Sequence, residues 1–292
     1  MSVVLIAGAS GLFGSHAAQA FARAGWEVRR YQRGTDMAAA AQGADVIVNA
    51  LNPPNYHNWA QLIPQITAQV LGATRASGAT VLVPGNVYNF GRAPGPWGPD
   101  TPQEPHTRKG KLRAAMEREY RASGLPVIVL RGGDYLDAGG QAQGMRYSLK
   151  DLAKGKIVPF GAPDVVRTYA YLPDMARAAV LLAEGRLTLP RFADVPFAGL
   201  AFSFDQLRAE LERVSGRSLR FAAFPWAIMR LASPFWEMAR ELLEMRYLHD
   251  LPHRMDPAPL AAILPDFKPH SLADVAAIQA QAYGLISTQT GR

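Results

Sequence analysis

The sequence predicts an α/β protein, built as a doubly wound parallel sheet with a smaller, mostly helical C-terminal lobe. Short apolar runs alternate with helix-like stretches as far as Leu130, and such runs are typical of strands that are covered on both faces. Of the 292 residues, 49% are hydrophobic and 19% charged, so a sizeable core can form and a disordered or coiled-coil chain is excluded. The 26 glycines and 22 prolines suit tight turns between strands and helices.

The N-terminus contains a complete strand–helix–strand unit. Ser2–Ala7 is an apolar run with β-branched residues, Ser15–Ala24 has helical character, and Trp26–Tyr31 is the second strand. Gly25 ends the helix, because glycine is favoured directly after a helix. The connection between the two strands is expected to be right-handed.

Strands and helices continue to alternate further along the chain. We expect strands over Asp45–Ala50, Thr80–Val83 and Pro126–Leu130, and helices over Met37–Gln42, Trp59–Ser77 and Thr107–Ser123. Asp36 is the expected cap of the first of these helices. After Arg131 the pattern changes, and helices are expected over Met145–Lys154, Leu172–Glu184, Ser203–Val214 and Pro225–Leu248.

Composition limits the classes of function. Cysteine is absent, which excludes disulfides, cysteine-bound metal centres and a cysteine nucleophile, and suits a cytoplasmic location. The formal net charge of +7 permits an anionic ligand, nucleic acid or an acidic membrane surface, and charge alone selects none of them. No apolar stretch reaches the roughly 18 residues of a membrane helix, so we expect no membrane partner. Nucleic-acid binding would rest on charge alone, so we expect no nucleic-acid partner.

Three glycines after the first strand predict a dinucleotide site. Gly8, Gly11 and Gly14 are spaced GxxGxxG between a strand and a helix. In this context glycines let the backbone approach a pyrophosphate, and free N–H groups with the helix dipole stabilise its charge. The expected cofactor contacts come from this turn and from the end of the third strand: Gly8, Ser10, Gly11, Leu12, Phe13, Gly14 and Ala50.

The end of the second strand favours NADP(H) over NAD(H). An acidic residue is expected there when the adenosine ribose has a free 2′-hydroxyl, whereas arginines suit a 2′-phosphate. The strand ends in arginines, and Glu27 lies at its other end. Arg33 is the best candidate contact, with Arg29 or Arg30 second. The alternative is that all three are ordinary surface arginines.

Several motifs in order resemble the extended short-chain dehydrogenase/reductase family, which is the NAD-dependent epimerase/dehydratase group. The turn matches the family's GxxGxxG, and Asp45–Ala50 is similar to its DxVxxxA strand. Three later segments also resemble family motifs: Val87–Gly91, Leu130-Arg131 with Gly139-Gly140, and Arg167–Asp174. The resemblance implies a Rossmann-type sheet. Residues 1–135 with about 167–190 would form the dinucleotide-binding domain, and 136–166 with 191–292 the substrate-binding lobe.

The catalytic positions depart from the family pattern. The family uses Ser, Tyr and Lys, the last two spaced YxxxK, and none of the ten tyrosines here has lysine four residues on. Alignment at the helix start places Thr107 on the tyrosine and Lys111 on the lysine, which binds the nicotinamide ribose in the family. The serine position falls near Pro84–Asn86. The interval from Arg33 to Asp45 is too short for the family's next strand, which we expect to be lost.

Other groups are therefore candidates for acid and for substrate contacts. A threonine cannot replace a phenol as the acid. Tyr88 at the end of the fourth strand and His106 are the alternative acids, although Tyr88 could be a packing aromatic and His106 a solvated loop residue. The resemblance makes Asn86, Arg131 and Arg167 candidate substrate contacts, with an internal ion pair as the alternative for Arg167. For Asp174 we prefer an acid in the first turn of a helix.

Two further signals are weaker. His249 and His253 have metal-like spacing, but Pro252 interrupts the helix, so we expect a loop and no metal. The aromatic and methionine-rich stretch Pro225–Leu248 is typical of a core or pocket wall. It favours a homodimer interface over a membrane-surface helix.

These observations favour an NADP(H)-dependent oxidoreductase of the atypical extended short-chain type, which transfers hydride to or from a carbonyl or alcohol of a small molecule. The alternatives are an NADP(H)-binding sensor without turnover, which the missing Ser and Tyr favour, and a nucleotide-sugar epimerase or dehydratase.

Overall fold

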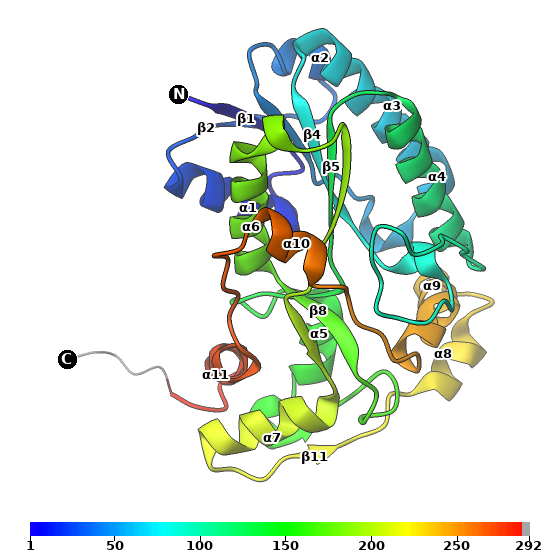
Figure 1. The fold of residues 1–292 in the computed structure, drawn as a ribbon. Coiled ribbons are helices and arrows are strands. Elements are labelled where there is room, and N and C mark those ends of the chain that lie inside the picture. Colours follow the sequence, from blue (N-terminus) through cyan, green and yellow to red (C-terminus); the bar gives the residue numbers. More distant parts are fainter. Residues whose placement is uncertain (288–292) are drawn as a thin grey trace. The chain divides into compact units, whose positions relative to one another are not determined.

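The computed structural model describes residues 1–287, and the chain divides into two compact units (Figure 1). The first contains residues 1–132, 173–197 and 255–267, and the second contains residues 133–172, 198–254 and the segment that begins at Lys268. The division differs from the expected one where strands pair. Residues 167–171 pair with strands of the second unit, whereas 192–196 extend the sheet of the first, and Met255 bridges to Trp97 there.

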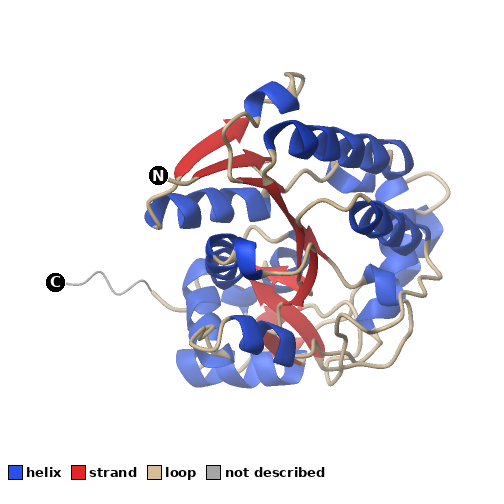
Figure 2. Ribbon diagram, turned by 45° about the horizontal axis from the view of Figure 1, so that its top comes forward, coloured by secondary structure: helices blue, strands red, loops and turns tan. Residues whose placement is uncertain are grey.

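The first unit contains a parallel sheet in the order β2-β1-β3-β4-β5-β9. Figure 2 shows strands in red and helices in blue. Its strands are β1 Val3–Ala7, β2 Glu27–Tyr31, β3 Val46–Asn49, β4 Thr80–Gly85, β5 Val127–Arg131 and β9 Phe192–Pro196. Ala7 pairs with both Tyr31 and Asn49, so these strands end together at one edge. The predicted fold class is confirmed. We expected the family's strand after Arg33 to be absent, and this is also confirmed, because β2 is the outermost strand in the order of the sheet.

Helices cover both faces of this sheet, with α1 and α6 on one face and α3 and α4 on the other (Figure 1). The bounds are α1 Leu12–Arg23, α2 Met37–Ala40, η1 Pro54–Tyr56, α3 Trp59–Ser77, η2 Tyr88–Phe90, α4 Arg108–Ala122, α6 Leu172–Glu184, η4 Arg186–Thr188 and α10 Ala258–Ile263. The side chain of Asp36 accepts hydrogen bonds from the first turn of α2, and Asp174 lies in the first turn of α6, as predicted.

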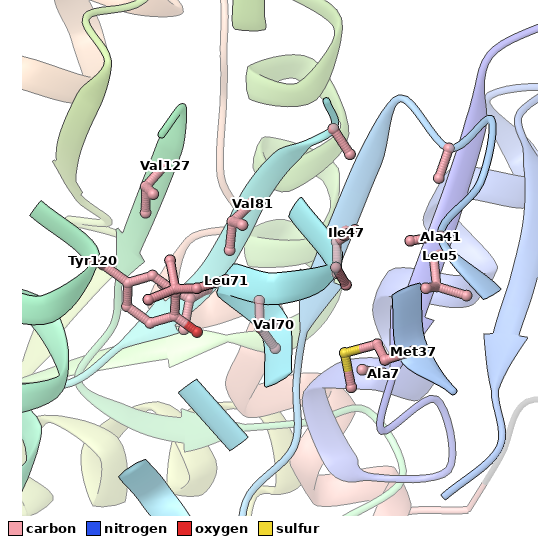
Figure 3. Packing of buried hydrophobic residues seen from close by; sticks show 14 of the residues in the cluster. Leu5, Ala7, Met37, Ala41, Ile47, Val70, Leu71, Val81, Tyr120 and Val127 are labelled. Atoms are coloured by element: carbon pink, nitrogen blue, oxygen red, sulfur yellow. The ribbon is translucent and has the colours of Figure 1, made fainter. Parts of the chain in front are cut away.

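The core between the sheet and α3 and α4 is apolar and closely packed (Figure 3). Leu5, Ile47 and Val81 project from neighbouring strands and are almost completely buried. They pack with Val70 and Leu71 of α3. Such burial explains why β1 is apolar throughout and why β3 and β5 are apolar up to their last residues, Asn49 and Arg131.

The second unit combines short strands with helices. A three-stranded sheet has the order β10-β8-β6, and β7 and β11 form a pair. The strands are β6 Asp134–Leu136, β7 Lys156–Ile157, β8 Arg167–Tyr171, β10 Leu200–Phe202 and β11 Arg220–Phe221. The helices are α5 Gln143–Leu149, η3 Leu152–Lys154, α7 Phe204–Ser215, α8 Trp226–Ala232, α9 Glu237–Met245, η5 Arg246–His249 and α11 Leu272–Ala282.

The single helix expected over Pro225–Leu248 is wrong. The stretch forms α8 and α9, separated at residues 233–236, because Pro234 has no N–H to continue a helix. Large apolar side chains around this break are exposed, among them Leu231 (81%) and Phe235 (95%). A homodimer interface over this stretch stays a prediction. Within residues 1–287, no helix is both long enough and apolar enough to cross a bilayer.

Candidate functional site

The glycine turn connects β1 to α1 at the carboxyl edge of the first unit's sheet. Gly8 has φ +89°, and a Cβ there would lie 2.7 Å from the carbonyl oxygen of Ala50, at the end of β3. A Cβ on Gly14 would overlap the carbonyl oxygen of Gly8. Gly11 donates its N–H to Gly8 at 2.9 Å. The turn therefore requires glycine where the sequence predicts it, and the structure brings Ala50 beside it.

The start of α1 presents backbone N–H groups at this turn. Gly11 is the N-cap and contributes no side-chain hydrogen bond to the helix. The first-turn amides belong to Leu12, Phe13 and Gly14, and they carry the positive end of the helix dipole. Phe13 anchors the turn, since its ring is 4% exposed in the core. This arrangement suits a phosphate group.

The arginines at the end of β2 differ in their contacts. Arg29 is engaged, because its Nε lies 2.6 Å from Glu27 and its Nη1 donates to the carbonyl of Gln42 at 2.7 Å. Arg30 and Arg33 are exposed. Arg33 follows Tyr31, the partner of Ala7 in the sheet, by two residues. Of the three, Arg33 is the one that lies beyond the end of β2, and this end of the strand is level with Ala7, which precedes the glycine turn.

At the start of α4, Thr107 and Lys111 do not have the surroundings that their alignment with the family's YxxxK motif predicts. Thr107 precedes the helix as its N-cap, and its Oγ1 accepts a hydrogen bond from the N–H of Gly110 at 3.1 Å. Lys111 lies on the exposed side of α4. The hydroxyl of Thr107 thus has a structural role, and Lys111 is not on the face that packs against the protein.

Two other cations occupy the buried face of α4. Lys109 is 1% exposed and Arg113 is 8% exposed, and their spacing of four residues places both on one side of the helix. The Nζ of Lys109 lies 4.6 Å from the centroid of the Tyr56 ring, and the Cζ of Arg113 lies 4.6 Å from that of Trp59. Arg113 also donates to the Oδ1 of Asn52 at 2.6 Å. This pair was not among the site residues predicted from the sequence.

The segment that carries these aromatic partners has an unusual backbone. Asn55, Tyr56 and Asn58 all have positive φ, at 55°, 62° and 51°. Asparagine tolerates this region, but a bulky tyrosine seldom adopts it. The Nε1 of Trp59 donates to the carbonyl of Pro53 at 3.1 Å and closes the segment. Such strain is frequent at functional sites.

The predicted acids Tyr88 and His106 lie at the end of β4 and before α4. Tyr88 is half-buried and packs against the apolar core, and its backbone N–H donates to the Oδ1 of Asn86 at 3.0 Å. A Cβ on Gly110 would lie 2.5 Å from the carbonyl oxygen of Tyr88, so this segment contacts the start of α4 directly. His106 is exposed. The structure therefore brings the backbone of Tyr88 against Gly110 at the start of α4, and leaves His106 exposed before the helix.

Arg131 belongs to an internal network. It is 1% exposed and donates five hydrogen bonds: two to Glu117, two to Asp194 and one to the carbonyl of Asn86. These use every N–H group of an arginine. Burial opposes its charge, but attraction to both carboxylates raises the pKa of Arg131 above its usual range. Burial also raises the pKa of Asp194. No donor of Arg131 is left for a substrate.

Arg167 of the second unit is likewise engaged inside the protein. Its Nη1 lies 2.8 Å from Asp134 and 2.8 Å from the Nδ1 of His249, and its Nη2 donates to the hydroxyl of Tyr169 at 2.7 Å. The internal ion pair considered for Arg167 is therefore present. Burial, and then the charge of Arg167, lower the pKa of His249 to about 4. The Nδ1 of His253 faces the carbonyl of Leu251 at 2.7 Å instead.

Among known proteins, only solved structures are similar to this chain. No family model and no curated protein matches the sequence. Among solved structures, MoeE5 in complex with UDP-glucose and NAD is 17% identical, with TM-score 0.75 over 96% of this chain and 98% of that one. The UDP-glucose 4-epimerase of Brucella ovis in complex with NAD is 18% identical, with TM-score 0.75 over 97% and 99%. The UDP-glucuronic acid 4-epimerase of Bacillus cereus in complex with NAD is 17% identical, with TM-score 0.73 over 96% and 99%.

The chain has the fold of the NAD-dependent epimerases and dehydratases. The resemblance stated from the sequence is thereby confirmed at the level of the fold. Within this epimerase/dehydratase fold, the position expected for the serine contains Gly85 and Asn86, and the buried pair on α4 is Lys109 and Arg113. An alignment of the YxxxK motif shifted two residues later would have selected Lys109 and Arg113. The sequence contains a signal for this shift, because the apolar Met116 and the aromatic Tyr120 lie on the same buried face of α4.

The second unit of this chain also contains an open pocket. It measures about 340 Å³ and is lined by aromatic side chains, a cation and a carboxylate, among them Phe160, Phe224, Trp226, Arg246 and Asp250. The ring of His249 stacks on Phe160, with centroids 5.0 Å apart. The sequence analysis did not identify this cavity, because its walls come from three separate segments of the chain.

Proposed function

We propose that this protein is an NADP(H)-dependent oxidoreductase of the atypical extended short-chain type, which reduces a carbonyl group or oxidises the corresponding alcohol. One observation carries the proposal: a strand, a glycine turn and an uncapped helix start, with an arginine just beyond the end of the neighbouring strand. That combination matches the chemistry of a diphosphate that is joined to a 2′-phosphorylated ribose.

The residues of the turn fit such a cofactor. The amides of Leu12 and Phe13 would bind the diphosphate, and Gly8 and Gly14 keep the turn compact, because neither position has room for a Cβ. Ala50 would lie beside the cofactor at the end of β3. A bound nicotinamide dinucleotide supplies or accepts the hydride. The protein would supply position, exclusion of water and the proton.

Arg33 supports a preference for NADP(H). It is exposed, and residues 1–287 contain no ion pair to it at salt-bridge distance. An arginine binds a phosphate by paired, charge-assisted hydrogen bonds. Arg29 is less suited because Glu27 and Gln42 already engage its guanidinium.

A second candidate is nucleotide-sugar epimerisation or dehydration. The comparison structures favour it, since those of MoeE5 and of two epimerases share this fold over nearly the whole chain. Both candidates begin with hydride transfer at the same edge of the sheet. They differ in whether the cofactor is consumed, so a product assay separates them: net NADPH oxidation for a reductase, and a changed sugar without net oxidation for an epimerase.

Calorimetric titration with NADPH and with NADH tests the proposal. A charged hydrogen bond to the 2′-phosphate contributes about 1.5–3 kcal/mol, so NADPH should bind at least about tenfold more tightly than NADH. Arg33→Ala should remove that difference and leave NADH binding unchanged. Arg23→Ala, at the far end of α1, is the matched control and should change neither. Equal affinities for the two cofactors would contradict the NADP(H) preference, and no binding of either would overturn the proposal.

A further inference from the structure

We propose that Lys109 is the side chain that hydrogen-bonds and protonates the substrate oxygen, and that Arg113 is the positioning residue beside it. The assignment rests on the proposed function, because it requires hydride chemistry at the carboxyl edge of the first unit's sheet. It replaces Thr107 and Lys111, the residues that alignment at the helix start selects.

The geometry of α4 carries the first step. Lys109 and Arg113 have the spacing of a YxxxK pair, so their side chains project from one face of the helix. Both are buried, whereas Lys111 on the same helix is exposed. Lysine and arginine seldom lose nearly all contact with solvent, so two such residues on one face need a functional or electrostatic reason.

The surroundings of the pair carry the second step. Three of its contacts come from the segment that follows β3: Asn52, Tyr56 and Trp59. Asn52 is two residues from Ala50, whose carbonyl oxygen lies against the glycine turn. The Tyr56 ring approaches the ammonium of Lys109, and the backbone at Tyr56 has a positive φ of 62°. A short, strained segment thus connects the cofactor turn to the two cations.

The chemistry of the side chains carries the third step. The family's tyrosine donates a proton to, or takes one from, the substrate oxygen. Ordinary lysine and tyrosine side chains release their protons at a similar pH, about 10, whereas a threonine hydroxyl does not ionise in that range. A lysine can therefore perform the task that Thr107 cannot. Arg113 keeps its charge throughout and would provide the fixed positive charge that the family's lysine provides.

The proposed step balances with NADPH as the reductant. The carbonyl carbon gains a hydride from NADPH, the π electrons of the C=O bond move to oxygen, and this oxygen takes a proton from the Nζ of Lys109. Lys109 is left as a neutral amine and regains a proton from water. In the oxidising direction each transfer is reversed, and the neutral amine accepts the proton of the alcohol.

Carbon-13 NMR of the metabolically labelled lysine side chains tests where Lys109 lies. The chain has six lysines, so the signal that is missing from the Lys109→Met spectrum is assigned directly, and Lys111→Met assigns its neighbour. NADPH is expected to shift the Lys109 signal and to leave the Lys111 signal in place. If calorimetry detects NADPH binding while the Lys109 signal does not move, the assignment is overturned and the proposed function stands. If NADPH does not bind, both fall.

Turnover tests the role. NADPH oxidation is followed with a panel of aldehydes, ketones, UDP-glucose and UDP-glucuronic acid. Lys109→Met is expected to lower kcat by about 100-fold or more, with the dissociation constant for NADPH unchanged, and Lys111→Met to resemble the unaltered protein. Arg113→Lys should retain activity that Arg113→Met loses, because the lysine keeps a charge there. Equal activity of the Lys109 and Lys111 variants, or a panel without turnover by a protein that binds NADPH, overturns the role.

Discussion

Replacing Arg131 with methionine, a shorter and uncharged side chain, is expected to destabilise the first unit by about 3–5 kcal/mol. The magnitude follows from the partners. Arg131 donates two hydrogen bonds each to Glu117 and Asp194, and all three side chains are almost completely buried. Without the guanidinium, two carboxylates would remain together in the interior, where a carboxylate without a partner is costly.

Urea unfolding followed by circular dichroism measures this effect. Arg118→Met is the control, because Arg118 lies on the exposed side of α4 and should change the free energy of unfolding by no more than about 0.5 kcal/mol. A triple variant that also changes Glu117 and Asp194 to methionine should recover most of the loss, since it leaves no buried charge behind.

The result that would refute the reasoning is a loss below about 1 kcal/mol for Arg131→Met, which is the range of an exposed ion pair. A stable Arg131→Met protein with normal NADPH binding and weak turnover would instead support the substrate contact that the family resemblance implies. The two measurements together therefore distinguish a structural from a functional arginine.

Three further results are expected. Gly14→Ala should abolish NADPH binding and destabilise the protein by about 1–3 kcal/mol, because the added Cβ would overlap Gly8. Gly72→Ala is the control: it adds the same atom where nothing lies within 4 Å, and it should stabilise α3 by up to about 1 kcal/mol. Thr107→Ala should cost about 1 kcal/mol in urea unfolding, and Thr107→Ser should restore it; a loss of turnover without a loss of stability would contradict the capping role. The pKa of His249 is lowered to about 4 in the folded protein, so the unfolded chain binds the proton more readily, and stability should fall by up to roughly 3 kcal/mol as pH decreases from 6.5 towards 4. His249→Asn should reduce that dependence and leave the part that comes from His253, because burial also lowers the pKa of His253 to about 4. An unchanged slope in the His249 variant would exclude His249 as a source.

The fold could be predicted from the sequence because its signals are local. Four strands of the first unit, β1, β3, β4 and β5, contain short apolar runs. The glycine spacing, the cap at Asp36 and the helix over Trp59–Ser77 also depend on neighbouring residues. The missing strand was visible as a short interval between Arg33 and Asp45. Such features do not require knowledge of distant contacts.

The site was predicted only in part because its chemistry depends on which helix face is buried. Alignment at the start of α4 selected Thr107 and Lys111, but burial selects Lys109 and Arg113. Nothing local distinguishes the cations of this helix, since their difference arises from the segment after β3 that packs on them.

Arg131 illustrates a second reason. Its partners are 14 and 63 residues away in sequence, so a motif identifies the arginine without revealing that its donors are already used. The break at Pro234 was different, because the sequence contains the proline and the helix expected over Pro225–Leu248 disregarded it. That error could have been avoided from residue type alone.

A crystal structure of the protein with NADPH tests the central claim most directly. The account predicts the diphosphate at the start of α1, within hydrogen-bond distance of the amides of Leu12 and Phe13, and the 2′-phosphate beside Arg33. A diphosphate bound elsewhere, such as in the aromatic cavity next to Trp226, with the glycine turn closed to it, would contradict the account.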